Sequence, residues 1–219
     1  MKLLALDTST EACSAALHIG GKTASRYEFA PKKHAELILP MVDQLLTEAQ
    51  IKLTDLDAIA FGRGPGSFTG VRIATGIAQG LAYSADLPLL PVSSLATLAQ
   101  AVNGKAETIA AIFDARMGEV YYGLYRSGAI VELLGEESVI PPDRIIPGNI
   151  TGCFGVGSGW ASYVDSLKKI FAGHLEGYDP DRYPNALDMI PLALQAFRRG
   201  ELKTPEEAAP VYLRNDVTG

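Results

Sequence analysis

The sequence has few of the residues that bind metals or form disulfides. It contains two cysteines and three histidines, far apart in the chain: Cys13, Cys153, His18, His34 and His174. Neither cysteine belongs to a CxxC motif, so a disulfide framework and a zinc site both have little support. We expect both cysteines to be reduced core thiols in a cytoplasmic protein.

Long apolar runs and basic blocks are also missing. No stretch approaches the roughly 20 apolar residues that a membrane-spanning helix needs, so no membrane contact is expected. The apolar run near the N-terminus is interrupted at Asp7, which predicts a strand rather than a signal peptide. The net charge is −6, and the 19 lysines and arginines are scattered. Because a protein that grips nucleic acid alone usually has a basic patch, we expect a partner to carry any such contact.

The hydrophobic pattern that is present predicts an α/β protein. In the first half, strands are expected at 3–7, 12–19, 22–29, 56–62 and 87–92, and helices at 31–50, 69–85 and 93–102. Further strands are expected near 129–134 and 151–157, further helices near 161–171 and 184–199, and an extended end at 204–217. A hydrophobic content of 47% is ample for a packed core.

The pattern of the N-terminal half restarts near residue 110. LLALDTSTEACSAALHIGG aligns with AAIFDARMGEVYYGLYRSG, which places Asp7 over Asp114 and Leu17 over Leu124. Each copy is an apolar strand that ends in aspartate, followed by a short turn and a second strand. We therefore predict two similar lobes, residues 1–104 and 105–219, with a C-terminal segment that can pack back on the first lobe.

The stretch FGRGPGSFTGVR, residues 61–72, joins a predicted strand to a predicted helix, where phosphate is often held. It lacks the lysine of a P-loop, the spacing of GxGxxG and the GxSxG order of a nucleophile elbow. Glycines permit a close backbone approach, and Ser67 or Thr69 can cap the following helix. The loop is therefore interpreted as mainly structural.

The helix after this loop carries Gly76 and Gly80 one turn apart. Each interior glycine costs about 1 kcal/mol relative to alanine, and a closely packed neighbouring helix would offset that cost. The apolar helix at 31–50 is a candidate neighbour. The pair can bury one face and offer another to a partner, although both faces can also be internal. The predicted interface residues are His34, Leu37, Ile38, Met41, Leu45, Arg72, Ile73, Gly76, Gln79, Gly80 and Tyr83.

Five segments carry a resemblance to a known family: LALDTSTEACSAAL, KHAELILPMVDQLL, GRGPGSFTGVRIATGIAQGLA, PVSSLATLA and PVYLR. Through them the sequence resembles, over essentially its whole length, the TsaB (YeaZ) family of bacterial tRNA threonylcarbamoyladenosine biosynthesis proteins. The resemblance implies a two-lobed α/β fold of the actin, sugar kinase and Hsp70-like (ASKHA) type. Each lobe is then built on a βββαβα core.

The resemblance also implies a non-catalytic, accessory role. Such proteins pair with TsaD, a catalytically competent relative, and with the ATPase TsaE, in threonylcarbamoyl transfer to the adenosine next to the tRNA anticodon. The same helix surface could form a homodimer when TsaD is absent, because like surfaces in related folds can self-pair. The acidic charge balance leaves any tRNA contact to the partners. Where TsaD has its metal-binding NHxxxH motif, this chain has Ser94 and Leu98, so no metal or cofactor of its own is expected.

In this fold, the strand–turn–strand of each lobe can cradle phosphates, and active members hold magnesium through acids there. Here the second such turn contains bulky Arg116, which favours a remnant of the site over hydrolysis. ATP or ADP could still lie at the interface with partners. The residues expected near it are Asp7, Thr8, Ser9, Gly66, Ser67 and Asp114.

Two other functions stay open at this point. The fold can support an ATP-hydrolysing, phosphotransferase or peptidase-like enzyme, although no Ser-His or Cys-His pairing is readable at local spacing. Direct tRNA binding is the third hypothesis, and the acidic charge balance argues against it.

Overall fold

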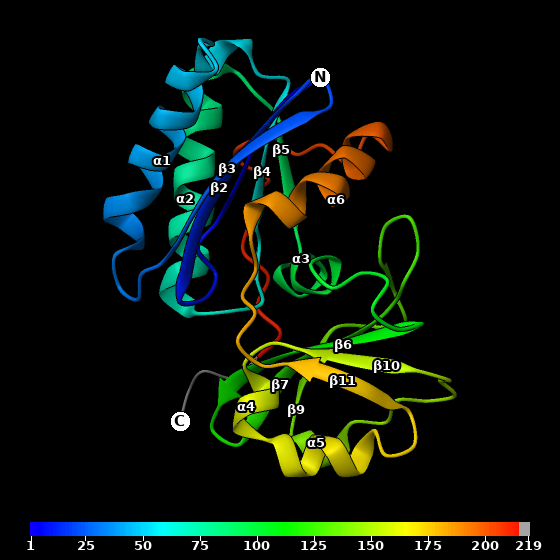
Figure 1. The fold of residues 1–219 in the computed structure, drawn as a ribbon. Helices are drawn as coiled ribbons and strands as arrows, with labels where there is room; N and C mark the ends of the chain where they lie inside the picture. The colour runs from blue at the N-terminus through cyan, green and yellow to red at the C-terminus, as the bar shows by residue number, and fades with distance from the viewer. Residues whose placement is uncertain (215–219) are drawn as a thin grey trace. The chain divides into compact units, whose positions relative to one another are not determined.

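The computed structural model describes residues 1–214, and the chain forms two compact units. Unit 1 comprises Met1–Thr97 and Pro184–Val211, and unit 2 comprises Leu98–Tyr183 and, among the described residues, Tyr212–Arg214 (Figure 1). The sequence placed the division after residue 104 and assigned 184–211 to the second lobe, while allowing a C-terminal segment to pack back. In the structure the division falls within a short helix, and residues 184–211 belong with the first unit.

Unit 1 is a five-stranded sheet covered on both faces. The strand order is β3-β2-β1-β4-β5, with β1 antiparallel to β2 and parallel to β4. Helices α1 and α2 cover one face, and α6 covers the other (Figure 1). Its elements are β1 (Lys2–Asp7), β2 (Ala12–Ile19), β3 (Lys22–Phe29), α1 (His34–Glu48), a 3-10 turn (Leu53–Asp55), β4 (Ala58–Gly62), α2 (Phe68–Ala85), β5 (Leu89–Val92), the start of α3 (Ser94–Gln100) and α6 (Ala186–Arg198).

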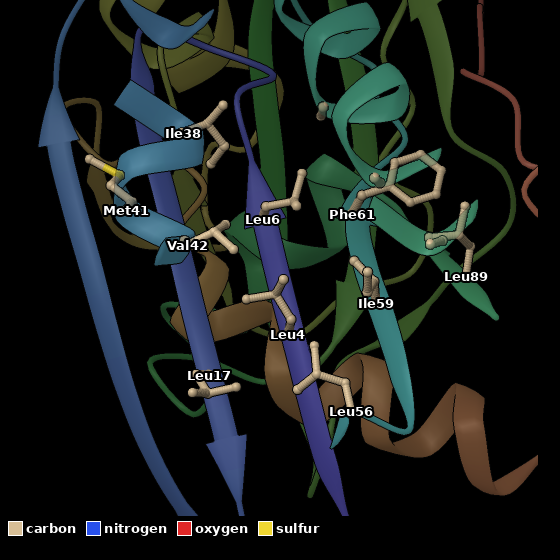
Figure 2. Close-up of a cluster of buried hydrophobic side chains, with 14 of the residues drawn as sticks. Leu4, Leu6, Leu17, Ile38, Met41, Val42, Leu56, Ile59, Phe61 and Leu89 are labelled. Atoms are coloured by element: carbon tan, nitrogen blue, oxygen red, sulfur yellow. The ribbon is translucent and has the colours of Figure 1, made fainter. Parts of the chain in front are cut away.

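The core of unit 1 follows from the alternation of side chains along its strands. Leu4 and Leu6 point to the side where Ile38 of α1 lies (Figure 2), whereas Leu3 packs toward Met189 of α6. Both faces of β1 are therefore apolar, as expected of a central strand that is covered by helices on each side. Complete burial of a leucine side chain contributes about 1.5–3 kcal/mol, so this double-sided packing dominates the stability of the unit.

Unit 2 repeats the antiparallel start of unit 1 but not its helices. The order is β11-β10-β6-β7-β8, with β9 paired to β7, and α4 and α5 contribute to its core. In unit 2, only a 3-10 turn lies between β9 and β10, where the βββαβα order has a helix. The expected core is therefore complete in unit 1 and shortened in unit 2. The elements are β6 (Thr108–Arg116), β7 (Glu119–Arg126), β8 (Glu132–Leu133), β9 (Ser138–Ile140), the 3-10 turn (Pro142–Arg144), β10 (Cys153–Val156), α4 (Gly159–Ser162), α5 (Val164–Ile170) and β11 (Leu175–Asp179).

Most of the predicted elements are present, and two short strands, β9 and β11, were missed by the sequence pattern. Among the helices of residues 1–214, none has both the length and the apolarity needed to cross a membrane.

Candidate functional site

The β1–β2 turn lies directly on the glycine-rich loop between β4 and α2. A side chain is excluded at three glycines in this loop and at its two ends, because a Cβ there would overlap the turn. The overlaps would be of Gly62 with the Asp7 carboxyl, of Gly66 with the Ser9 carbonyl and of Gly70 with the Thr8 carbonyl. The glycines therefore serve a close approach of two backbone segments.

Hydrogen bonds join the same two segments. Thr8 Oγ1 donates to Gly70 O at 2.7 Å, and Ser67 N donates to Ser9 O at 2.7 Å. Ser67 Oγ also accepts from Gly70 N at 3.4 Å, which confirms Ser67 as the predicted helix cap. An amide at the start of α2 is thus satisfied by the protein's own turn, which supports the structural interpretation of the loop.

Asp7 lies at the end of β1 and is 1% exposed. Its Oδ1 accepts from Ser9 N at 2.8 Å and from Ser9 Oγ at 2.7 Å. Burial raises the pKa of the Asp7 carboxyl, and hydrogen bonds from Ser9, the charge of His34 and the hydroxyl of Ser94 oppose that rise in part. Thr8 and Ser9 are buried too.

The residues predicted to lie near a nucleotide therefore divide into two groups. Asp7, Thr8 and Ser9 are sealed inside unit 1 and cannot contact a nucleotide in this conformation, because the β4–α2 loop covers them. Gly66 is half-buried and Ser67 is exposed, so these two remain accessible. The sequence named all five residues as candidates near a nucleotide. The structure brings the five together, but they do not form an open phosphate cradle.

Asp114, the counterpart of Asp7 in unit 2, is held by its own neighbours. Its carboxylate accepts from Arg116 N at 2.8 Å, from Ser162 Oγ at 3.1 Å and from the Arg116 guanidinium at 3.3 Å. Arg116 and Met117 both have positive φ in the β6–β7 turn. The side chain of Arg116 thus forms an ion pair with Asp114 at the β6–β7 turn.

The positions that correspond to the histidines of the metal motif contain no ligand set. Ser94 is fully buried at the start of α3, and Leu98 is a fully buried core leucine. In residues 1–214, no three His, Cys, Asp or Glu side chains gather in a way that could hold a metal ion.

Helix α2 carries the part of the predicted interface that faces solvent. Arg72, Gly76, Gly80 and Tyr83 are exposed, and Ile73 is half-buried. A Cβ at Gly76 or Gly80 would have no atom within 4 Å, so nothing in unit 1 packs into this notch. These five residues form a continuous strip along α2, which we call the α2 ridge.

Other predicted interface residues are turned inward, and the sequence prediction is corrected for them. Ile38, Met41 and Leu45 are buried in the core of unit 1 against β1 and β2, and Figure 2 shows Ile38 and Met41 there. His34 is buried as well, and Leu37 is half-buried. The physical reason is the helical period: residues 38, 41, 42 and 45 share one face of α1, and that face covers the sheet.

Two further residues alter the predicted interface: Gln79 is removed from it, and Phe68 is added to it. Gln79 is occupied internally, because its side-chain amide donates to two carbonyls of the C-terminal segment. Phe68 was missed, although it is 60% exposed, and the guanidinium of Arg72 lies 3.2 Å from the centre of its ring. The i, i+4 spacing of an aromatic and an arginine on one helix was the available signal.

A groove of about 630 Å³ opens at the end of α2, beside Tyr83. Its lining mixes apolar residues such as Leu87 and Pro88 with charged residues of both signs, among them Asp86 and Lys203. The lining residues are Ala82, Tyr83, Asp86, Leu87, Pro88 and those of segment 202–207. The groove extends the surface of the α2 ridge toward the C-terminal part of unit 1.

Two α/β units with related strand–turn–strand starts define a protein of the ASKHA class. The family model for TsaD, described as tRNA N6-adenosine threonylcarbamoyltransferase, matches residues 25–212. The tRNA threonylcarbamoyladenosine biosynthesis protein TsaB of Escherichia coli K12 is 45% identical over 226 residues, which cover 99% of this chain and 96% of that protein. The chain therefore belongs to the TsaB (YeaZ) family of tRNA threonylcarbamoyladenosine biosynthesis proteins, as the resemblance predicted.

Two solved structures agree with this family assignment. One, described as YeaZ from Pseudomonas aeruginosa, has a TM-score of 0.90 and 49% identity, covering 97% of this chain and 99% of that one. The other, described as an uncharacterized protein with similarity to peptidase YEAZ from Pseudomonas aeruginosa, has a TM-score of 0.91 and 48% identity with the same coverage. The ASKHA-type fold predicted from the sequence is confirmed.

Proposed function

We propose that this chain is a non-catalytic scaffold that pairs with TsaD and acts with TsaE in threonylcarbamoyl transfer to the adenosine next to the tRNA anticodon. Its relatives carry names from the biosynthesis of threonylcarbamoyladenosine, which supports the pathway. The pairing with TsaD and the absence of catalytic activity in this chain are proposals. In this view the protein is cytoplasmic, contacts tRNA only through its partners and needs no cofactor of its own.

The observation that carries the proposal is the open notch of the α2 ridge. Glycines at two successive turns of an 18-residue helix cost about 1 kcal/mol each, and unit 1 places no atom against them. Exposed Tyr83 and Arg72 flank the notch, and aromatic residues and arginine are the side chains enriched at protein interfaces. A helix of a partner could approach the backbone closely here.

A related fold is the natural occupant, because like surfaces pair through matching elements. We therefore propose that the α2 ridge packs on the corresponding helix of TsaD, and on a second copy of this chain when TsaD is absent. ATP or ADP held at such a joint would meet Gly66 and Ser67, the accessible part of the glycine-rich loop.

The test is light scattering after size exclusion, with and without TsaD. Gly80→Leu should weaken the complex by about tenfold or more, because the added side chain fills the notch. Gly80→Ala is the matched control: it raises helix propensity but adds a single methyl group, and binding should persist. Unchanged binding by a folded Gly80→Leu variant, and by the equivalent Gly76→Leu variant, would reject the proposed surface.

The alternative is an enzyme of the same fold: an ATPase, a phosphotransferase or the peptidase suggested by the description of one structural relative. Its support is weaker, since Asp7 is sealed by the loop and the carboxylate of Asp114 is taken by Arg116 and Ser162. Direct tRNA binding by the chain alone would be recognised by a steep loss of affinity with salt.

A further inference from the structure

Asn103 and Gly104 form the single Asn-Gly pair of the sequence, in the turn between α3 and β6. An asparagine followed by glycine is especially prone to deamidation, because glycine has no side chain to hinder attack of its backbone nitrogen on the asparagine side chain. The turn nevertheless favours glycine: Lys105 N donates to Val102 O at 3.1 Å, and Gly104 has a φ of +86°. The reactive pair is therefore built into the turn.

The carboxamide of Asn103 is held by the segment between β7 and β8, residues 127–131, which we call the 127–131 corner. Asn103 Nδ2 donates to Gly128 O at 2.8 Å, and Gly128 N donates to Asn103 Oδ1 at 3.2 Å. One partner is a backbone carbonyl and the other a backbone amide, so the two ends of the carboxamide cannot be exchanged. The carbon atom that deamidation attacks, Asn103 Cγ, thus lies between two hydrogen bonds that fix its orientation.

The attacking atom, the backbone nitrogen of Gly104, is held by the same corner. Gly104 N donates to Ser127 Oγ at 3.3 Å, and Ser127 Oγ donates in turn to Ala106 O at 2.6 Å. The backbone nitrogen of Ser127 donates to Glu107 O at 2.9 Å. Attack requires the Gly104 nitrogen to lose its proton and to turn toward Asn103 Cγ, and the hydrogen bond to Ser127 opposes both changes.

We propose that Asn103 is a deamidation site that the 127–131 corner keeps closed, and that its conversion releases the corner irreversibly. In the reaction the Gly104 nitrogen bonds to Asn103 Cγ, the Cγ–Nδ2 bond breaks, and ammonia leaves with the proton that the Gly104 nitrogen gives up. Water then opens the cyclic imide at either carbonyl, which gives aspartate or isoaspartate at position 103. The site lies within unit 2, and its chemistry does not depend on the partner of the chain.

The product does not fit the corner as asparagine does. A carboxylate can still accept from Gly128 N, but it has no hydrogen to donate, so the oxygen that replaces Nδ2 would face Gly128 O as a second acceptor. Isoaspartate also lengthens the backbone of the turn by a carbon atom. The hydrogen bond of Val131 N to Gln100 Oε1, at 3.0 Å, joins the same two segments and loses this support. Conversion thus makes a reversible opening of the corner permanent.

The experiment follows deamidation at Asn103 in the full-length chain by peptide mass spectrometry at mildly alkaline pH. The folded wild-type protein should convert at least about tenfold more slowly than the same chain in guanidinium chloride, because the corner must open before the nitrogen can attack. Equal rates in the folded and the unfolded wild-type chain would overturn the proposal. This comparison needs no variant.

A variant of the corner tests whether Ser127 protects the site. Ser127→Ala removes the acceptor of Gly104 N, so conversion of the folded protein should become about threefold faster or more, while the rate in guanidinium chloride stays unchanged. Ser84→Ala, at an exposed serine of α2, is the matched control and should change neither rate. A folded Ser127→Ala variant that converts as slowly as the wild type would reject the protective role of the corner.

Hydrogen exchange tests the release of the corner. In Asn103→Asp, the backbone amides of Ser127 and Val131 should exchange at least about tenfold faster than in the wild type, whereas the amides of β2 in unit 1 should be unaffected. Wild-type protein that is incubated until Asn103 has converted should show the same change, and this arm does not depend on the folding of a variant. Unchanged exchange at the corner in the converted protein would reject the proposed release.

Discussion

The side-chain amide of Gln79 donates a hydrogen bond of 2.8 Å to the carbonyl oxygen of Ala208. The same amide nitrogen donates to Pro205 O at 3.0 Å. Ala208 is 3% exposed and belongs to the core that α1 and α2 form on the sheet. One side chain of α2 thus ties residues 205–208 to unit 1, which makes Gln79 a structural residue rather than part of the α2 ridge.

Replacing Gln79 should therefore affect stability. Gln79→Ala removes two hydrogen bonds and leaves two carbonyls to find other partners, so the free energy of unfolding should fall by about 1–3 kcal/mol. Gln44→Ala, at an exposed glutamine of α1, should change it by no more than about 0.5 kcal/mol. Urea unfolding of both variants gives the comparison. Weaker TsaD binding by Gln79→Ala at unchanged stability would instead restore Gln79 to the interface.

The same substitution should have opposite effects at two glycines of α2. A Cβ at Gly70 would overlap the carbonyl oxygen of Thr8, whereas one at Gly76 would meet nothing within 4 Å. Gly70→Ala should destabilise by about 1–3 kcal/mol, since backbone must move. Gly76→Ala should stabilise by up to about 1 kcal/mol through helix propensity. Thermal unfolding of the pair tests this, and a loss of stability in both would mean that the notch at Gly76 is closed in solution.

Much of unit 1 could be predicted from the sequence because its patterns are strong. Residues 12–29 form two strands joined at Gly20 and Gly21, and Ser67 precedes a long apolar helix. The destination of residues 184–211 could not be predicted in the same way. The apolar face of α6 shows that it covers a sheet, but the periodicity of a helix does not say which sheet.

At the candidate site, too, the sequence pattern did not show which segments pack against one another. The sequence named Thr8, Ser9 and residues of the glycine-rich loop as candidates near a nucleotide. In the structure the two segments meet because each follows one of two neighbouring parallel strands, β1 and β4. Spacing alone could not show that the two segments touch, because a turn that holds phosphate and a turn that fills the gap use the same small residues. The outward and inward faces of α1 were likewise confused, because Ile38 and Leu37 are equally apolar in sequence.

The two thiols should be unreactive in the native protein. Burial raises the pKa of Cys13 to about 12 and that of Cys153 to about 11, from an ordinary value of 9.0. The thiolate is the reactive form, so at about pH 8 each native thiol should be alkylated at least roughly a hundredfold more slowly than in urea. Mass spectrometry of iodoacetamide-treated protein measures both rates. Rapid native labelling of either cysteine would show that its region of the core opens readily.

ATP turnover by the purified chain separates the scaffold from the enzyme. A hydrolytic site of this fold needs an acid that can reach magnesium, but Asp7 is sealed and Asp114 is paired with Arg116. We therefore expect no turnover above that of the Asp7→Asn variant, measured as phosphate release with magnesium present. Asp114→Asn provides the matched variant in unit 2. Substantial turnover that is lost in both variants would require the loop to open and would establish the enzyme instead. Turnover that persists in both would point to a contaminating ATPase and would leave the expectation intact.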